Sequence, residues 1–168
     1  MPQHCDEFRA ELVALLPKLR AFARFLARDA VLADDLVQDT VLRALRSGRP
    51  DDLTTDLRLW TFAILRNRFR DQRRRAAVER VALERQMPTE QGRAGNQEAS
   101  AALNDLDTAL SRLPTVQREA LTLVAALGFS VEEAASIAGV PAGTIKARIS
   151  RARLRLAREP AAPAWQGK

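Results

Sequence analysis

The residues best suited to chemistry are basic side chains near the C-terminal end of the chain. Residues 129–158 read FSVEEAASIAGVPAGTIKARISRARLRLAR, and the part after Pro141 carries six basic residues and no acid. Such side chains hold phosphates and hydrogen-bond to base edges, whereas bond-breaking chemistry needs other groups. The segment therefore predicts a polyanionic partner, and the spacing of its residues indicates how that partner is bound.

The same residues mark two short helices joined by a tight turn. Ser130, with Glu133 three residues later, forms a capping box at the start of the first helix. Gly139 can adopt the positive φ that ends a helix, and Pro141 suits the first turn of the next helix because it has no N–H to leave unpaired. This arrangement is typical of a helix-turn-helix whose second helix enters a DNA major groove.

Helical periodicity divides the second helix into a core-facing and an exposed side. An apolar stripe at i, i+4, i+7 and i+11 predicts the core-facing side: Ile145, Ile149, Ala152 and Leu156. Small and basic residues on the opposite side are expected near base edges: Lys146, Ala147, Ser150, Arg151 and Leu154. Flanking arginines are expected to hold phosphates: Arg148, Arg153, Arg155 and Arg158. The alternative, a solvated surface helix, is disfavoured because such a helix normally gains stability from i,i+4 Glu–Arg pairs.

A second basic segment runs from Leu57 to Arg75. Phe62, Leu65 and Phe69 share one side and are expected in a core. Much of the remaining surface is basic or amidic: Arg66, Asn67, Arg70, Arg73 and Arg74. Arginines hold phosphates, and amides and aromatic rings such as Trp60 can receive unstacked bases, so the segment predicts contacts with nucleic acid. For Trp60 itself, a core-anchoring role is the favoured interpretation.

Composition narrows the classes of function. The chain has 168 residues, a net charge of +6 and a sequence pI of about 10.8, which favours nucleic acid or an anionic membrane surface as partner. The single Cys5 excludes an internal disulfide and fits a reducing cytoplasm, and with only His4 beside it a zinc site is not expected. The sequence contains no signal peptide and no apolar run long enough to span a bilayer. It also contains no phosphate-binding glycine loop and no nucleophile elbow, so we expect neither an active site nor a cofactor.

Strand signals are almost absent, so the sequence predicts an all-α fold of two small helical domains joined by a flexible linker. The predicted domains are residues 1–77 and 101–160, with a linker at 78–100 and a tail at 161–168. Pro17 predicts a kink or two shorter helices within the first helical segment. Helical segments are expected at Cys5–Ala27, Ala30–Arg46 and Leu57–Arg75, the last with a helix-compatible extension to Gln86. A loop is expected at 47–56. Helices are expected again from Ala99 onward, including one at Val116–Leu127.

Three motifs in this order resemble one family, the extracytoplasmic-function (ECF) sigma factors of bacterial RNA polymerase. They are ADDLVQDTVLRAL at 33–45, LRLWTFAILRNRFRD at 57–71 and LPTVQREALTLVAALGFSVEEAASIAGVPAGTIKARISRARLRL at 113–156. The resemblance covers nearly the whole chain except the linker and the tails. The wording at 118–139 is most similar to the general-stress-response branch of the family.

The resemblance implies three sets of functional residues. One would dock on core RNA polymerase: Asp34, Asp35, Leu36, Gln38, Asp39, Leu42 and Arg43. A second, including the loop that captures a flipped base, would bind the single-stranded minus-10 element: Arg49, Asp51, Asp52, Trp60, Arg66, Asn67, Arg70, Arg73 and Arg74. A third would read the minus-35 element as duplex: Thr144, Lys146, Ala147, Arg148, Ser150, Arg151 and Arg155. The family often has aromatic residues at the positions of Val41 and Leu45. Both residues here are apolar, so the docking side keeps its apolar character.

By resemblance, the chain would be an initiation factor rather than an enzyme, held by an anti-sigma protein until a stress response releases it. Two other classes remain as alternatives. A helix-turn-helix regulator would bind duplex only, which Leu57–Arg75 argues against. A sigma-like decoy for an anti-sigma protein would be expected to lack the basic recognition side. A membrane-surface binder is disfavoured because no lipid-facing stripe accompanies the basic residues.

Overall fold

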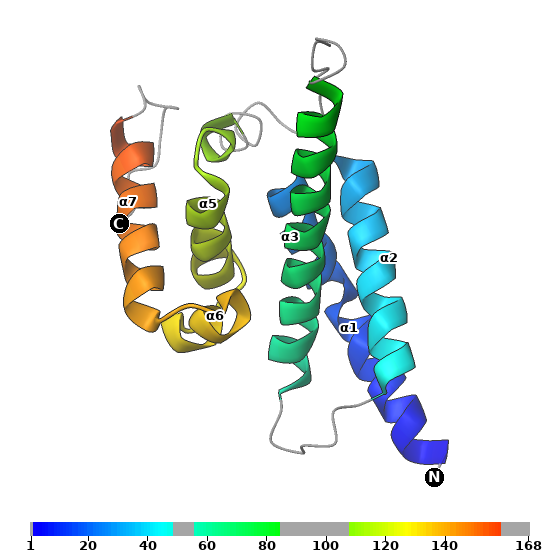
Figure 1. Cartoon of the computed structure of the whole chain (residues 1–168). Coiled ribbons are helices and arrows are strands. Elements are labelled where there is room, and N and C mark those ends of the chain that lie inside the picture. The colour runs from blue at the N-terminus through cyan, green and yellow to red at the C-terminus, as the bar shows by residue number, and fades with distance from the viewer. Residues whose placement is uncertain (1, 49–55, 85–107, 159–168) are drawn as a thin grey trace. The chain divides into compact units, whose positions relative to one another are not determined.

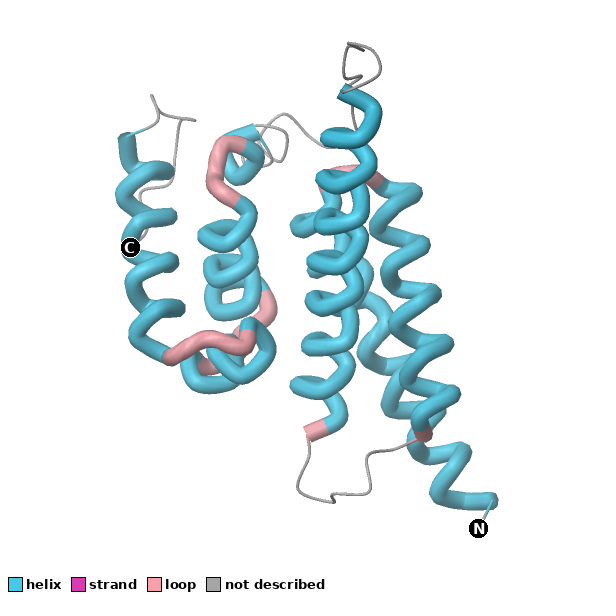
Figure 2. The backbone as a smooth tube through the Cα atoms, in the orientation of Figure 1, coloured by secondary structure: helices cyan, strands magenta, loops and turns pink. Residues whose placement is uncertain are grey.

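The structure, a computed structural model, describes residues 2–48, 56–84 and 108–158. Every regular element within these ranges is a helix (Figure 1, Figure 2), which confirms the all-α prediction. The chain divides into two compact units, residues 1–95 and 96–168. Most of the predicted linker and the whole predicted tail lie outside the described residues, so these boundaries stay predictions.

The first unit contains α1 (Pro2–Ala27), α2 (Ala30–Ser47) and α3 (Leu57–Glu84), and each of these helices packs against the other two. Asp29 caps α2, because its Oδ1 accepts a hydrogen bond from the Leu32 N–H at 2.8 Å. The rings of Phe22 and Phe62, 5.4 Å apart between centroids, join α1 to α3. The core is built from apolar side chains at helical spacing: Leu12, Leu19, Phe22, Leu26, Leu36, Phe62, Leu65 and Phe69.

In the first unit, α1 continues through Pro17. Of the two expected alternatives, a kink or two shorter helices, the division into two helices does not occur. The Pro17 ring lies on the exposed side, and burial of Leu12 and Leu19 around it offsets the missing backbone hydrogen bond. α3 extends to Glu84, in agreement with the helix-compatible extension expected beyond Arg75. Leu45 is 43% exposed and lies beside the buried stripe of α2.

The second unit begins, in its described part, with helical residues 108–111. It continues with α5 (Thr115–Leu121), the π-helical turn η1 (Thr122–Ala126), α6 (Val131–Ala138) and α7 (Ala142–Arg158). The helix expected over Val116–Leu127 is present as α5 followed directly by η1, where the Leu127 N–H donates to the Thr122 carbonyl five residues back, at 3.0 Å. A π turn holds one extra residue, and here it leaves both Leu123 and Phe129 buried.

The turn between α6 and α7 has the geometry that the sequence predicts. Ser130 Oγ accepts from the Glu133 N–H at 3.0 Å, and Glu133 Oε2 accepts from the Ser130 N–H at 2.7 Å, which completes the capping box. Gly139 ends α6 in the left-handed region, with φ +60° and ψ +40°. The Pro141 carbonyl accepts from the Thr144 N–H at 2.9 Å, so Pro141 stands immediately before the first residue of α7.

We expect Gly139→Ala to lower the free energy of unfolding by about 1–2 kcal/mol, because an L side chain is strained at this φ. Urea unfolding followed by circular dichroism measures the change. Gly143→Ala is the matched control: Gly143 lies inside α7, and a Cβ there meets no atom within 4 Å. Alanine should leave stability unchanged or raise it at Gly143. Equal losses for the two variants would contradict a role for the left-handed turn.

Candidate nucleic-acid interface

The recognition helix α7 is held by its apolar stripe. Ile145, Ile149 and Ala152 are buried, as the sequence predicts, and α7 packs against both α5 and α6. α6 offers a small-residue surface, with Ala134, Ala135 and Ala138 buried, so the two helices can approach closely. This packing fixes which side of α7 is left for a ligand.

The opposite side of α7 carries the residues expected near base edges. Lys146, Ser150 and Arg151 are exposed, Ala147 is half-buried, and Leu154 is 56% exposed. The flanking Arg153, Arg155 and Arg158 are exposed as well. Side chains of this size and charge along one exposed side suit an approach to the edges and phosphates of a duplex.

Two residues of the expected minus-35 set are less accessible than the periodicity suggests. Thr144 and Arg148 are half-buried, and the Arg148 Nη1 atom is buried without a hydrogen-bond partner in the described structure. Arg148 was expected beside the other phosphate-holding arginines, but part of its guanidinium is turned away from solvent. Arg151 and Arg155 remain the accessible arginines of that set.

On α2, the expected polymerase-docking set divides into exposed and buried members. Leu36 has 0% exposure and belongs to the core, so it cannot touch a docked protein, and its assignment to the docking surface is wrong. Asp39 forms an ion pair with Arg68 of α3, which partly occupies its carboxylate. We call the exposed members the α2 surface: Asp34, Asp35, Gln38, Leu42 and Arg43.

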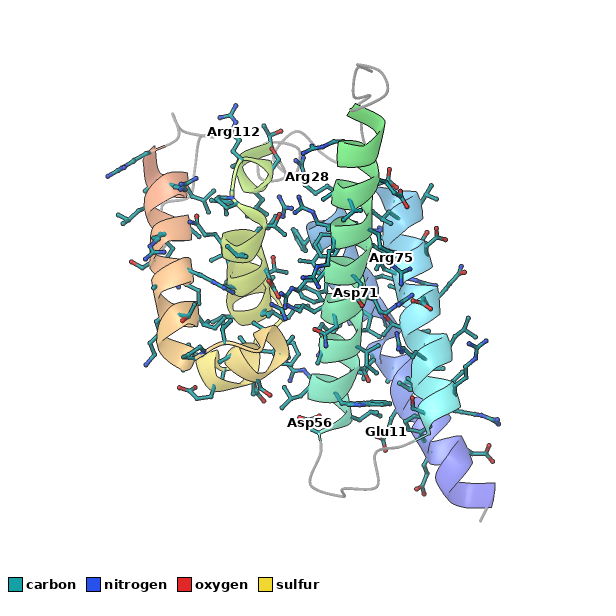
Figure 3. All side chains as sticks on the ribbon, viewed as in Figure 1. Glu11, Arg28, Asp56, Asp71, Arg75 and Arg112 are labelled. Carbon is teal, nitrogen blue, oxygen red and sulfur yellow. The ribbon has the colours of Figure 1, made fainter. Side chains whose placement is uncertain are left out.

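On α3, the expected single-strand-binding set also divides. Arg66 is only 6% exposed, unlike the other arginines of the set, and its contact with DNA stays a prediction. Asp71, labelled on α3 in Figure 3, is exposed near the basic residues. The exposed members, which we call the α3 surface, are Asn67, Arg70, Arg73 and Arg74.

Trp60 has the core-anchoring place that the sequence favours. Its ring is half-buried and packs against a cluster of Phe8, Leu12, Ala44 and Leu57. This cluster joins the end of α2 to the start of α3, and so it fixes both sides of the loop between them. The expected loop contacts Arg49, Asp51 and Asp52 lie outside the described residues.

The start of α3 is fixed by a cap that sequence reasoning did not identify. Asp56 Oδ1 accepts from the Arg58 N–H at 2.8 Å, and the Asp56 carbonyl accepts from the Trp60 N–H at 3.0 Å. Asp56 lies at the end of α3 that adjoins the loop (Figure 3). An Asp immediately before the first apolar residue of a helical segment, here Leu57, is the signal that could have found it.

Among the described side chains, no group of His, Cys, Asp and Glu could hold a metal ion. Within the same part of the chain, no helix is long and apolar enough to cross a membrane. The candidate nucleic-acid contacts are basic and amide side chains, on α3 in the first unit and on α7 in the second.

Two family models match the chain. The sigma-70 region 2 model matches residues 12–78, and the sigma-70 region 4 model matches residues 103–156. Among curated proteins, the ECF RNA polymerase sigma factor EcfG of Rhodopseudomonas palustris (strain TIE-1) is 44% identical over 155 residues, which cover 90% of this chain and 83% of that protein. The ECF RNA polymerase sigma factor SigM of Mycobacterium tuberculosis (strain ATCC 25618 / H37Rv) is 36% identical over 142 residues, 84% of this chain and 70% of that protein.

Solved structures show the same likeness. The sigma factor RpoE, in complex with the anti-sigma factor NepR from Bartonella quintana, is 41% identical with a TM-score of 0.76, covering 89% of this chain and 94% of that one. CnrH, in complex with the cytosolic domain of CnrY, is 29% identical with a TM-score of 0.60, covering 93% of this chain and 91% of that one.

The division of the docking set predicts different losses of stability for two leucines on α2. We expect Leu36→Ala to lower the free energy of unfolding by about 2–5 kcal/mol, because it opens a cavity in a closed core. Leu42→Ala, on the 51% exposed Leu42, should change it by no more than about 0.5 kcal/mol. Urea titration measures both. A large loss at Leu42, or none at Leu36, would contradict the division.

Proposed function

Because the chain belongs to the sigma-70 family of RNA polymerase sigma factors, in its extracytoplasmic-function group, we propose that its two units contact a promoter at two separate elements. A sigma factor directs core RNA polymerase to specific promoters, and this is the function of the chain. The proposal concerns how the residues described above divide that work.

The observation that carries the proposal is the acid-free exposed side of α7 on a helix-turn-helix. Lys146, Ala147, Ser150 and Arg151 would read base edges of the minus-35 duplex, while Arg155 holds phosphates beside them. Because the buried stripe fixes the helix orientation, these side chains are presented without further ordering of the backbone.

The first unit would bind polymerase and open the minus-10 element. The α2 surface would dock on the polymerase, and Asn67, Arg70 and Arg74 of the α3 surface would contact the unpaired strand. Extruding a base from a duplex costs a few kcal/mol, which contacts in a base-reading pocket offset. We place Arg49, Asp51 and Asp52 of the loop at that pocket.

We further propose that an anti-sigma protein holds the chain inactive until a stress response releases it. One of the similar solved structures is a sigma factor bound to such a regulator, RpoE to the anti-sigma factor NepR, and another, CnrH, is bound to the cytosolic domain of CnrY. The likeness to EcfG and to the RpoE–NepR complex supports the general-stress-response branch.

Catalysis would reside in the polymerase, so we assign no reaction to the chain itself and place it in the cytoplasm with its polymerase. A regulator that binds duplex only is the second candidate. The exposed Asn67 beside the arginines of α3 favours the sigma-factor mechanism, because a duplex-only regulator has no need of a second surface for unpaired bases.

Run-off transcription with core RNA polymerase tests the proposed function directly. Adding the purified chain to core enzyme and a template with a general-stress-response promoter should produce a transcript of defined start. The same reaction without the chain is the control. A chain that adds no promoter-specific initiation on any of a panel of such promoters would contradict the proposal.

The division of labour predicts different defects for two substitutions. Arg151→Ala should weaken binding to a minus-35 duplex by about 1–3 kcal/mol if Arg151 reads a base. Asn67→Ala should impair promoter opening and leave duplex binding nearly unchanged. Fluorescence anisotropy with a labelled duplex measures the first effect, and 2-aminopurine fluorescence in the minus-10 element measures the second. Equal loss of duplex binding in both variants would contradict the assignment.

A further inference from the structure

An ion pair joins α2 to α3, which lie side by side in the first unit (Figure 1). The Arg68 Nε donates to the Asp39 Oδ2, and the side chains of Arg68 and Asp39 are 23% and 40% exposed, respectively. On its own helix, Asp39 has an opposite charge one turn away, at Arg43. Arg68 likewise has Asp71 one turn away on α3. The pair forms between the helices instead, so it fixes one helix against the other.

The pair lies at the turn of α3 that carries Asn67. Residues adjacent in a helix point about 100° apart, so Arg68 is directed toward α2 while Asn67 is exposed on the neighbouring side. Buried Leu65 and Phe69 hold this turn against the core, but apolar burial is non-directional. A hydrogen bond between charged groups requires a defined geometry. The pair therefore limits rotation of α3 about its own axis, on which the direction of the Asn67 amide depends.

Asp39 is poorly placed to contact polymerase directly. Its neighbours on the α2 surface, Gln38, Leu42 and Arg43, are all exposed. Asp39 is half-buried, and its carboxylate already accepts the Arg68 N–H. A cation of a docked protein would have to compete with Arg68, and it would leave the half-buried guanidinium without its partner. Such a contact would therefore add little to docking.

We propose that Asp39 and Arg68 are positioning residues for capture of the unpaired minus-10 strand. Asp39 acts through Arg68, and the pair holds the α3 turn so that Asn67 faces the strand. Neither the carboxylate nor the guanidinium needs to touch polymerase or DNA. The inference rests on the proposed function, because it requires that Asn67 contacts unpaired DNA. It moves Asp39 from polymerase docking to strand binding and adds Arg68, which belongs to neither set.

Promoter opening at a saturating concentration of the chain separates positioning from docking. The readout is 2-aminopurine fluorescence in the minus-10 element, with core RNA polymerase and increasing amounts of the full chain. Asp39→Ala and Arg68→Ala should each lower the opening rate at saturation by about fivefold, because the turn of α3 is no longer held. Leu42→Ala, on the α2 surface, should instead raise the chain concentration that is needed and still reach the unaltered rate.

A double-mutant cycle tests whether the two residues act as a unit. The variant with both alanines should open the promoter no more slowly than either single variant, because the second substitution removes nothing further. Arg9→Ala is the matched control and should change neither rate nor affinity: Arg9 pairs with Asp6 within α1 at 3.7 Å, and their side chains are 63% and 76% exposed. Asp39→Asn, which keeps the size of the side chain, replaces Asp39→Ala if alanine impairs folding.

The outcomes separate this inference from the proposed function. If excess chain restores Asp39→Ala to the unaltered opening rate, Asp39 is a docking contact and the inference is overturned. Defects that add in the double variant would also overturn it, because the residues would then act independently. So would variants that only lower the free energy of unfolding, measured with urea, and open the promoter at the unaltered rate. In each of these cases the proposed function stands. If the unaltered chain opens no promoter, the proposed function fails, and the inference fails with it.

Discussion

Both proposed promoter contacts depend on one constraint: a helix crowded with arginine is held in place by the narrow apolar stripe on its other side. Ion pairs along α7 cannot offset repulsion among its six basic residues, since the helix contains no acid. Burial of Ile145, Ile149 and Ala152 supplies the attachment instead, at about 1.5–3 kcal/mol for a fully buried isoleucine. In α3, Phe62, Leu65 and Phe69 do the same for a helix with eight arginines.

Features of the fold that depend on the buried stripe and on local contacts could be predicted from the sequence. The buried stripe of α7, the capping box and the left-handed Gly139 were all predictable, because each depends on residues within one or two helical turns. Leu36 was assigned to the docking surface by resemblance, which indicates the docking helix but not the burial of each of its side chains. The π turn escaped prediction for a related reason, since one extra residue leaves the apolar pattern nearly unaltered.

In the first unit, the docking and strand-binding surfaces belong to helices that share one core. Leu36 of α2 and Phe62 and Leu65 of α3 are all buried in it, and Asp39 of α2 pairs with Arg68 of α3. Arg68 is adjacent to Asn67, so the ion pair lies beside the α3 surface as well as the α2 surface. Side-chain packing within one small helical unit would therefore determine the geometry between the proposed polymerase contact and the proposed contact with unpaired DNA.

The cluster around Trp60 has a consequence for how such a protein changes over generations. Phe8, Leu12, Ala44 and Leu57 pack with Trp60 at the two ends of the loop at 49–55, and Asp56 caps the helix that follows. These anchors all lie outside the loop that we propose captures a base of the minus-10 element. Substitutions within the loop would leave the anchors in place, so the proposed base preference could change over generations while this packing is retained.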